Sequence, residues 1–146
     1  MKAVLAERLS EVMTPMLAGG EHVETAAMAM VGVPSSARTA RLGLVLAVAT
    51  FGVLTLPSSP QKRFVVLTDR RLLVLAANRA TGHPTGTVVF EGRRSALRVV
   101  RAGSARFLLV IPVLRVEVAV PGAPAALRLL FPTSARHDGQ AIADAL

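Results

Sequence analysis

Between residues 63 and 131, short apolar runs alternate with turn residues, and this pattern constrains the fold more than any other feature. Runs of about four to eight residues, rich in β-branched side chains and bounded by Gly, Pro, Asn or Asp, are typical of antiparallel strands. In the run 114–120 (LRVEVAV), aliphatic residues alternate with Arg115 and Glu117, so one face is core and the other meets water. We predict about seven strands in a meander over 63–131, at 63–68, 72–77, 87–91, 97–101, 106–111, 114–120 and 126–131.

Helices are predicted on either side of this meander. In residues 1–20, Leu5, Leu9 and Met13 recur at the spacing of an amphipathic helix, which Pro15 should end near Met13. Residues 22–31 alternate weakly and could add a strand, while 138–146 predict a C-terminal helix capped by Asp138. With 146 residues, the chain has the length of one domain. The expected fold class is mainly β (α+β): one domain, 1–146, built as an antiparallel barrel or sandwich.

The segment 41–57 is the most unusual part of the sequence, because 42–56 (LGLVLAVATFGVLTL) is almost wholly apolar. As a helix, its fifteen residues would span about 23 Å, which is short of the roughly 30 Å hydrocarbon core of a bilayer. It could instead be a buried helix or buried strands. We rank burial within protein ahead of membrane insertion, and both remain open. The membrane or interface residues we assign to it are Leu42, Val45, Val48, Phe51, Val53 and Leu56.

Positive charge is concentrated in one region of the chain. The net charge is +8, and residues 62–115 hold eleven cations against Asp69 and Glu91. Cations also flank the apolar segment, and such a juxtaposition favours an anionic membrane surface. The residues we assign to lipid or partner binding are Arg38, Arg41, Lys62, Arg63, Arg70 and Arg71.

The run 64–75 (FVVLTDRRLLVL) resembles the strand, Thr-Asp-Arg-Arg turn and strand of bacterial pleckstrin-homology-like (PH-like) domains, and is similar to the related GRAM domain. In that turn, Asp69 can bond the backbone ahead of it and start the reversal, leaving Arg70 and Arg71 at the tip. The resemblance implies seven strands followed by a C-terminal helix. It also implies binding of phosphoinositides or proteins, although fold and function are separable.

No residue pattern indicates catalysis, a metal site or a cofactor. The chain has no cysteine, and His22, His83 and His137 stand far apart in sequence. Glycine-rich nucleotide loops and nucleophile elbows do not occur. We do not expect nucleic acid as a partner, because the chain has no Tyr or Trp on which bases could stack.

These observations predict a non-catalytic PH-like binding or scaffolding module. Its expected partners are anionic lipid headgroups or a membrane protein. The alternative is a soluble, self-assembling protein, such as a homo-oligomer, with residues 42–56 buried in its own core or in an oligomer interface. Residues 1–17 do not resemble a secretory signal, so we expect a cytoplasmic protein that could associate with the inner face of the plasma membrane.

Overall fold

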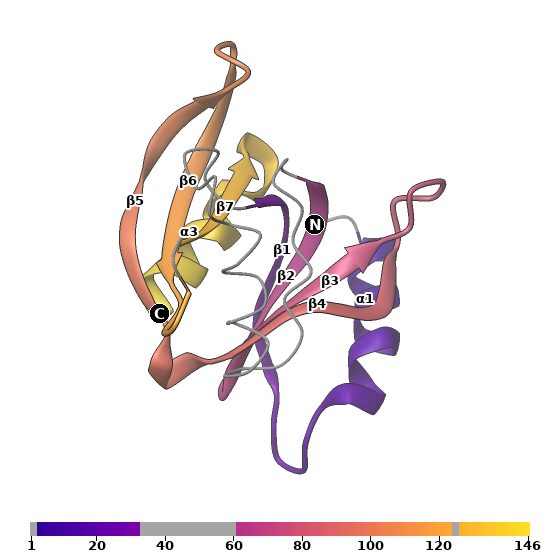
Figure 1. Ribbon diagram of the computed structural model, residues 1–146. Helices are drawn as coiled ribbons and strands as arrows, with labels where there is room; N and C mark the ends of the chain where they lie inside the picture. Colours follow the sequence, from indigo (N-terminus) through magenta and orange to yellow (C-terminus); the bar gives the residue numbers. More distant parts are fainter. Residues whose placement is uncertain (1–2, 33–60, 124–125) are drawn as a thin grey trace.

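The computed structural model describes residues 3–32, 61–123 and 126–146, which form a mainly β structure with two α-helices (Figure 1). All strand pairs are antiparallel. The helices are α1 (Ala3–Met13) and α3 (Arg136–Ala145), and short 3-10 turns occur at η1 (Thr14–Met16), η2 (Arg94–Ala96) and η3 (Thr133–Ala135). The strands are β1 (Val23–Gly32), β2 (Gln61–Thr68), β3 (Arg71–Ala77), β4 (Pro84–Arg93), β5 (Arg98–Phe107), β6 (Ile111–Ala119) and β7 (Leu127–Pro132).

The seven strands form one open sheet in the order β4-β3-β2-β1-β7-β6-β5. Strand β1 joins the two halves, because it pairs with β2 along most of its length and with β7 only from Met30 to Gly32. Although β4 and β5 follow each other in the chain, they lie at opposite edges and do not pair with each other in the described residues. The predicted closed barrel or two-sheet sandwich is therefore corrected to a single sheet with two edges.

The β5–β6 hairpin also differs from the prediction. Residues 97–101 and 106–111 were predicted to be two separate strands. Instead, β5 continues through Gly103, which pairs with Arg115 in extended conformation, and the turn lies at residues 108–110. The apolar run 107–111 resembles a buried strand in sequence, but it forms the end of the hairpin. The seventh strand is β1, from the weakly alternating N-terminal segment.

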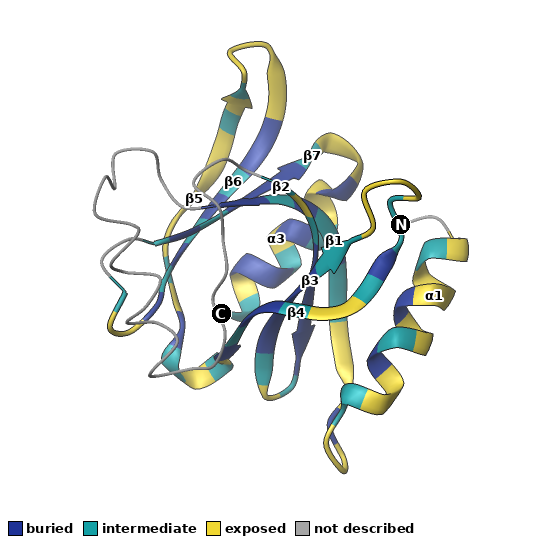
Figure 2. Cartoon of the chain, turned by 45° about the vertical axis from the view of Figure 1, so that its right-hand side comes forward, coloured by how far each residue is buried: buried dark blue, intermediate teal, exposed yellow. Residues whose placement is uncertain are grey.

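Residues 64–67 of β2 and 72–75 of β3 are apolar without interruption because both faces of these strands are covered. Phe64 and Val66 face the α1 side with Leu9 and Met13, whereas Val65 belongs to the main core, which includes Ile142 of α3. A strand buried on both faces loses the alternation of a half-exposed strand. Figure 2 shows the buried residues of the sheet between the two helices, whose outer faces are exposed.

Helix boundaries follow from local chemistry. Helix α1 ends at Met13, where Pro15 redirects the chain into a 3-10 turn. Helix α3 begins at Arg136, two residues before the predicted start, since η3 leads directly into it. Asp138 is therefore not a cap: it lies in the first turn, where a carboxylate still favours the positive end of the helix dipole.

Segment 41–57 lies outside the described residues, as do Arg38 and Arg41. Within the part of the chain that the structure describes, no helix is both long enough and apolar enough to cross a membrane.

Candidate functional site

The predicted site cations separate into two groups at opposite ends of β2. Lys62 and Arg63 begin the strand, whereas Arg70 and Arg71 lie at the turn that follows Thr68. A strand of this length spans about 26 Å, so the four cations do not lie together on one binding surface. The other predicted site residues lie outside the described residues: Arg38, Arg41, Leu42, Val45, Val48, Phe51, Val53 and Leu56.

Thr68, and not Asp69, organises the Thr-Asp-Arg-Arg turn. Its hydroxyl oxygen accepts hydrogen bonds from the backbone amides of Arg70 (3.1 Å) and Arg71 (2.9 Å). Asp69 instead ties the turn to the start of β1, since its Oδ1 accepts a hydrogen bond from the backbone amide of His22 at 3.0 Å. The sequence prediction gave Asp69 the capping role because Thr and Asp can both cap such a turn.

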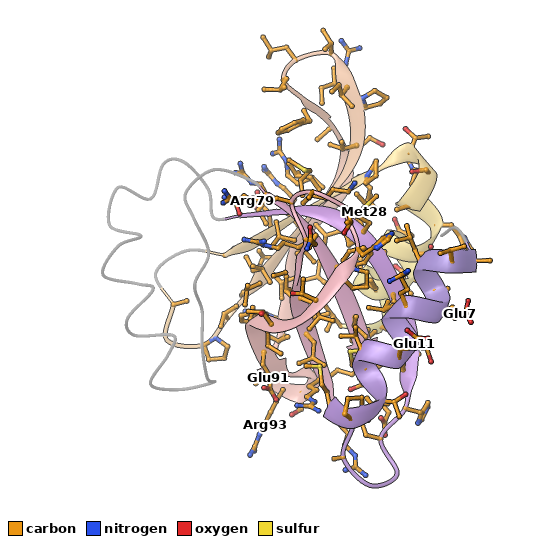
Figure 3. All side chains as sticks on the ribbon, turned by 90° about the vertical axis from the view of Figure 1, so that its right-hand side faces the viewer. Glu7, Glu11, Met28, Arg79, Glu91 and Arg93 are labelled. Carbon is orange, nitrogen blue, oxygen red and sulfur yellow. The ribbon has the colours of Figure 1, made fainter. Side chains whose placement is uncertain are left out.

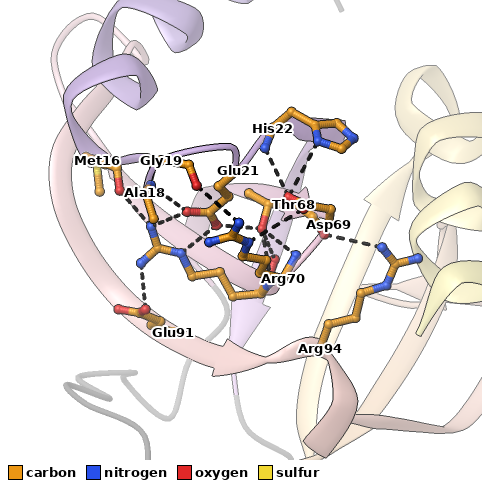
Figure 4. Close-up of polar contacts among 11 residues, drawn as sticks. Met16, Ala18, Gly19, Glu21, His22, Thr68, Asp69, Arg70, Glu91 and Arg94 are labelled. Atoms are coloured by element: carbon orange, nitrogen blue, oxygen red, sulfur yellow. Dashed lines mark hydrogen bonds and ion pairs between the residues drawn. The ribbon is translucent and has the colours of Figure 1, made fainter.

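Arg71 donates hydrogen bonds to two carboxylates and a carbonyl, those of Glu21, Glu91 and Met16, which Figure 4 labels. Its Nε donates to Oε1 of Glu21 at 2.8 Å, its Nη1 to Oε1 of Glu91 at 2.6 Å, and its Nη2 to the Met16 carbonyl at 2.6 Å. Glu21 is 7% exposed. Its Oε2 accepts from the Ala18 amide at 2.8 Å, and its Oε1 from the Thr68 hydroxyl at 2.7 Å.

This network shifts the pKa of both main partners. The hydrogen bond from Arg71 is the largest influence on Glu21 and, with further donors, outweighs burial and lowers its pKa to about 2. The same hydrogen bond raises the pKa of Arg71 above its ordinary value. A guanidinium whose donors are occupied in this way is unsuited to binding an external anion. Arg71 therefore joins the α1–β1 connection to the β2–β3 turn.

Arg70 is also directed at its own chain, although about half of its side chain is exposed. Its Nη2 donates to the Gly19 carbonyl at 3.1 Å, and its Nε lies 3.7 Å from Oδ2 of Asp69. The two arginines of the turn thus have partners within the fold.

The other end of β2 differs, because its cations line an open groove of about 620 Å³. Lys62 and Arg63 form one wall with Gln61. The other wall is formed by Ala77, at the end of β3, and residues 78–82 of the β3–β4 connection, which include Arg79. No carboxylate lines this groove in the described part of the chain. Figure 3 shows Arg79 at this end of the sheet, on the far side from Glu91 and Arg93.

The β3–β4 connection is a closely bonded turn that holds Arg79 in place. Oδ1 of Asn78 accepts from the amides of Ala80 (2.9 Å) and Thr81 (3.1 Å), and the Asn78 carbonyl accepts from the Gly82 amide at 2.7 Å. Gly82 has a φ of +70°, and a Cβ built there would lie 3.7 Å from Nζ of Lys62. The amine of Lys62 therefore lies against this turn.

Arg63 and Arg79 repel each other across the groove. Burial is the main cause that lowers the pKa of Arg63, and the positive charge of Arg79 lowers it further. Nη2 of Arg63 donates to Oε1 of Gln61 at 2.6 Å, but its buried Nε finds no acceptor among the described residues. Cations held together without a carboxylate among the described lining residues form a site that an anion would stabilise.

No protein-family model matches this chain, and no curated protein matches it.

Sequence reasoning missed Arg79, which has no motif around it. The hairpin register could have revealed it. Strands β2 and β3 are antiparallel and pair Arg63 with Ala76, so the start of β2 and the end of β3 meet at one edge. A cation three residues beyond Ala76 is therefore expected near Arg63.

The described residues contain no cluster of His, Cys, Asp or Glu able to hold a metal ion. The three histidines lie on separate parts of the fold: His22 precedes β1, His83 precedes β4, and His137 is in α3. A cavity of about 370 Å³ between α1 and β1 is lined mainly by apolar residues, and Asp138 is the one charged residue among those described in its lining. The arrangement at the groove suits binding of an anion by charge and hydrogen bonds.

Proposed function

We propose that this chain is a non-catalytic PH-like binding module that associates with an anionic membrane face through the groove formed by Lys62, Arg63 and Arg79. The observation that carries the proposal is the juxtaposition of three cations around one groove whose described lining residues include no carboxylate. The like-charge repulsion between Arg63 and Arg79 costs free energy in the unoccupied fold, and an anion would remove that cost.

Two features support the PH-like part of the proposal. The seven antiparallel strands are followed by a C-terminal helix, which agrees with the plan that the sequence resemblance implies. The Thr-Asp-Arg-Arg sequence forms the β2–β3 turn, as it does in the strand–turn–strand unit of that family. In this proposal Thr68 and Arg71 build the fold, and the groove at the opposite end of β2 binds the partner.

The chemistry of the groove favours a phosphate-bearing headgroup. Guanidinium groups donate paired hydrogen bonds that match the oxygens of phosphate, and an ammonium adds a compact charge. Near an anionic bilayer each cation contributes about 1 kcal/mol, so three cations support weak, reversible binding that salt screens. The net charge of +8 adds long-range attraction to such a surface.

The test is flotation of the protein with vesicles of phosphatidylcholine, with and without phosphatidylglycerol. We expect binding only to the anionic vesicles, and release as salt is raised. The double substitution Lys62→Glu/Arg79→Glu should abolish binding. The matched control, Arg8→Glu/Arg93→Glu, makes the same change in net charge at exposed positions outside the groove and should retain most of it. Equal loss in both variants would contradict a groove-specific site, and no binding by the unmodified protein would contradict the proposed function.

A further inference from the structure

The β5–β6 hairpin ends in four aliphatic residues that are exposed to solvent. The exposed fractions are 70% for Leu108, 85% for Leu109, 76% for Val110 and 45% for Ile111. Figures 1 and 2 show this hairpin projecting beyond the rest of the described chain, at the top of both views. Such a continuous apolar tip on a projecting element usually marks an interaction site.

The backbone of the tip is also unfavourable for the residues that occupy it. Leu108 and Leu109 have φ values of 50° and 65°, and the Val110 amide donates to the Phe107 carbonyl at 3.3 Å. A tight turn with positive φ at both central residues favours Asn-Gly. At positive φ the Cβ atom is crowded by the backbone, which glycine avoids and asparagine tolerates better than leucine. Two leucines thus add backbone strain and exposed apolar surface. Neither effect stabilises the isolated protein in water, and strain of this kind is typical of functional segments.

Cations lie a short distance behind the apolar tip. Arg106 is two strand residues before Leu108, which places its Cα about 7 Å away. Further back, Arg115 pairs with Gly103, and Nη2 of Arg136 donates to Oγ of Ser104 at 2.7 Å. Arg101, Arg106 and Arg115 line a shallow hollow on this hairpin, and none of the described residues in its lining is a carboxylate.

We propose that the tip formed by residues 108–111 inserts into the boundary between headgroups and acyl chains of an anionic bilayer, with Arg106 at the level of the phosphates. The order of groups along the hairpin, aliphatic first and cationic about 7 Å behind, matches the order of layers that an inserted element meets, since interfacial insertion reaches about 5–10 Å. A second copy of this chain fits less well, because it would bring the same cations together. The inference rests on the proposed function for its partner, but it concerns a different surface from the groove.

Insertion can be measured at the tip itself. The chain has no cysteine, so a single Leu109→Cys substitution can carry an environment-sensitive fluorophore. Ser10→Cys, exposed on α1, is the matched control. With anionic vesicles we expect a blue shift and quenching by nitroxide lipids for the label at position 109, and neither at position 10. Retained flotation with no spectral change at position 109 would overturn this inference alone. Failed flotation of the unmodified protein would instead overturn the proposed function, and this inference with it.

A second variant separates insertion from folding. Leu108→Asn/Leu109→Gly supplies the residues that the turn prefers and removes two apolar side chains. We expect an unchanged or higher thermal midpoint, together with a loss of vesicle affinity of at least about tenfold. Wild-type affinity in a folded variant would overturn the inference.

Discussion

Arg71 and Glu21, fifty residues apart in sequence, form a bidentate pair: Nε and Nη2 of the arginine donate to Oε1 and Oε2 of the carboxylate at 2.8 and 2.9 Å. Glu21 is buried and Arg71 is largely so. The pair fixes the segment between α1 and β1 against the β2–β3 turn. This contact explains why an arginine of the Thr-Asp-Arg-Arg turn points into the fold.

Substitution of Arg71 by alanine should strongly destabilise the protein. It leaves the carboxylate of Glu21 buried without its main partner, a change that costs about 3 kcal/mol or more in comparable buried pairs. The free energy of unfolding, measured by urea denaturation at neutral pH, checks this. Arg70→Ala is the matched control, because Arg70 is exposed and makes weaker contacts, and it should change stability by less than about 1 kcal/mol. Similar losses for both variants would contradict the structural role of Arg71.

Stability should fall at acid pH through Glu21. Its pKa is about 2 in the folded protein against an ordinary value of 4.5, so the folded state favours the charged form. Because folding lowers the pKa of Glu21, its carboxylate stabilises the folded state fully above the unfolded pKa. This stabilisation is lost as pH falls from about 4.5 to about 2. The loss amounts to about 3 kcal/mol.

The same urea titration, repeated at several pH values across this window, tests the assignment. A Glu21→Gln variant has no carboxyl to protonate at this position. We expect it to be less stable than the wild type at neutral pH and to show a flatter dependence below pH 4.5. Parallel curves for the two proteins would assign the acid sensitivity to other groups.

Substitution of Gly139 by alanine should destabilise the protein, although alanine normally stabilises a helix more than glycine does. A Cβ at this position would lie 2.4 Å from Cγ of Phe131, whose ring is fully buried. Either α3 must move away from β7 or the ring must leave its position, which typically costs about 1–3 kcal/mol. We expect Gly139→Ala to lower the thermal midpoint. Gly86→Ala, where a Cβ meets nothing within 4 Å, should leave the midpoint almost unchanged, and equal effects would contradict the close packing of α3.

The strand-rich fold class can be predicted from the sequence because the pattern of apolar and polar residues within each strand reflects the burial of that strand. Alternation in β6 and the apolar runs of β2 and β3 reflect burial, and the burial of β2 is nearly complete after Arg63. The hairpin end at residues 108–111 was misplaced for the same reason. An apolar run predicts a buried strand, and nothing local indicates that these four side chains face solvent.

The candidate site could be predicted only in part, since its residues meet through the sheet. Lys62 and Arg63 were identified from the charge near the apolar segment, whereas Arg79 joins them through the pairing of β2 with β3. Arg71 was assigned to the site because it was expected at the tip of the turn. Nothing in the sequence around Glu21, which follows two glycines, indicates that this carboxylate is buried and paired with Arg71. A sequence shows which side chains are charged, but it does not show which of them are already paired within the fold.

The most direct test of the groove is a titration with soluble glycerol phosphate at constant ionic strength, followed by amide chemical shifts of the protein. We predict shift changes centred on Lys62, Arg63 and residues 77–82, with saturation in the millimolar range typical of a few charge-assisted hydrogen bonds, about 1 mM to 10 mM. The Lys62→Glu/Arg79→Glu variant should show none of these changes. Shifts spread evenly over the exposed arginines, or centred on Arg70 and Arg71, would contradict a binding site in this groove.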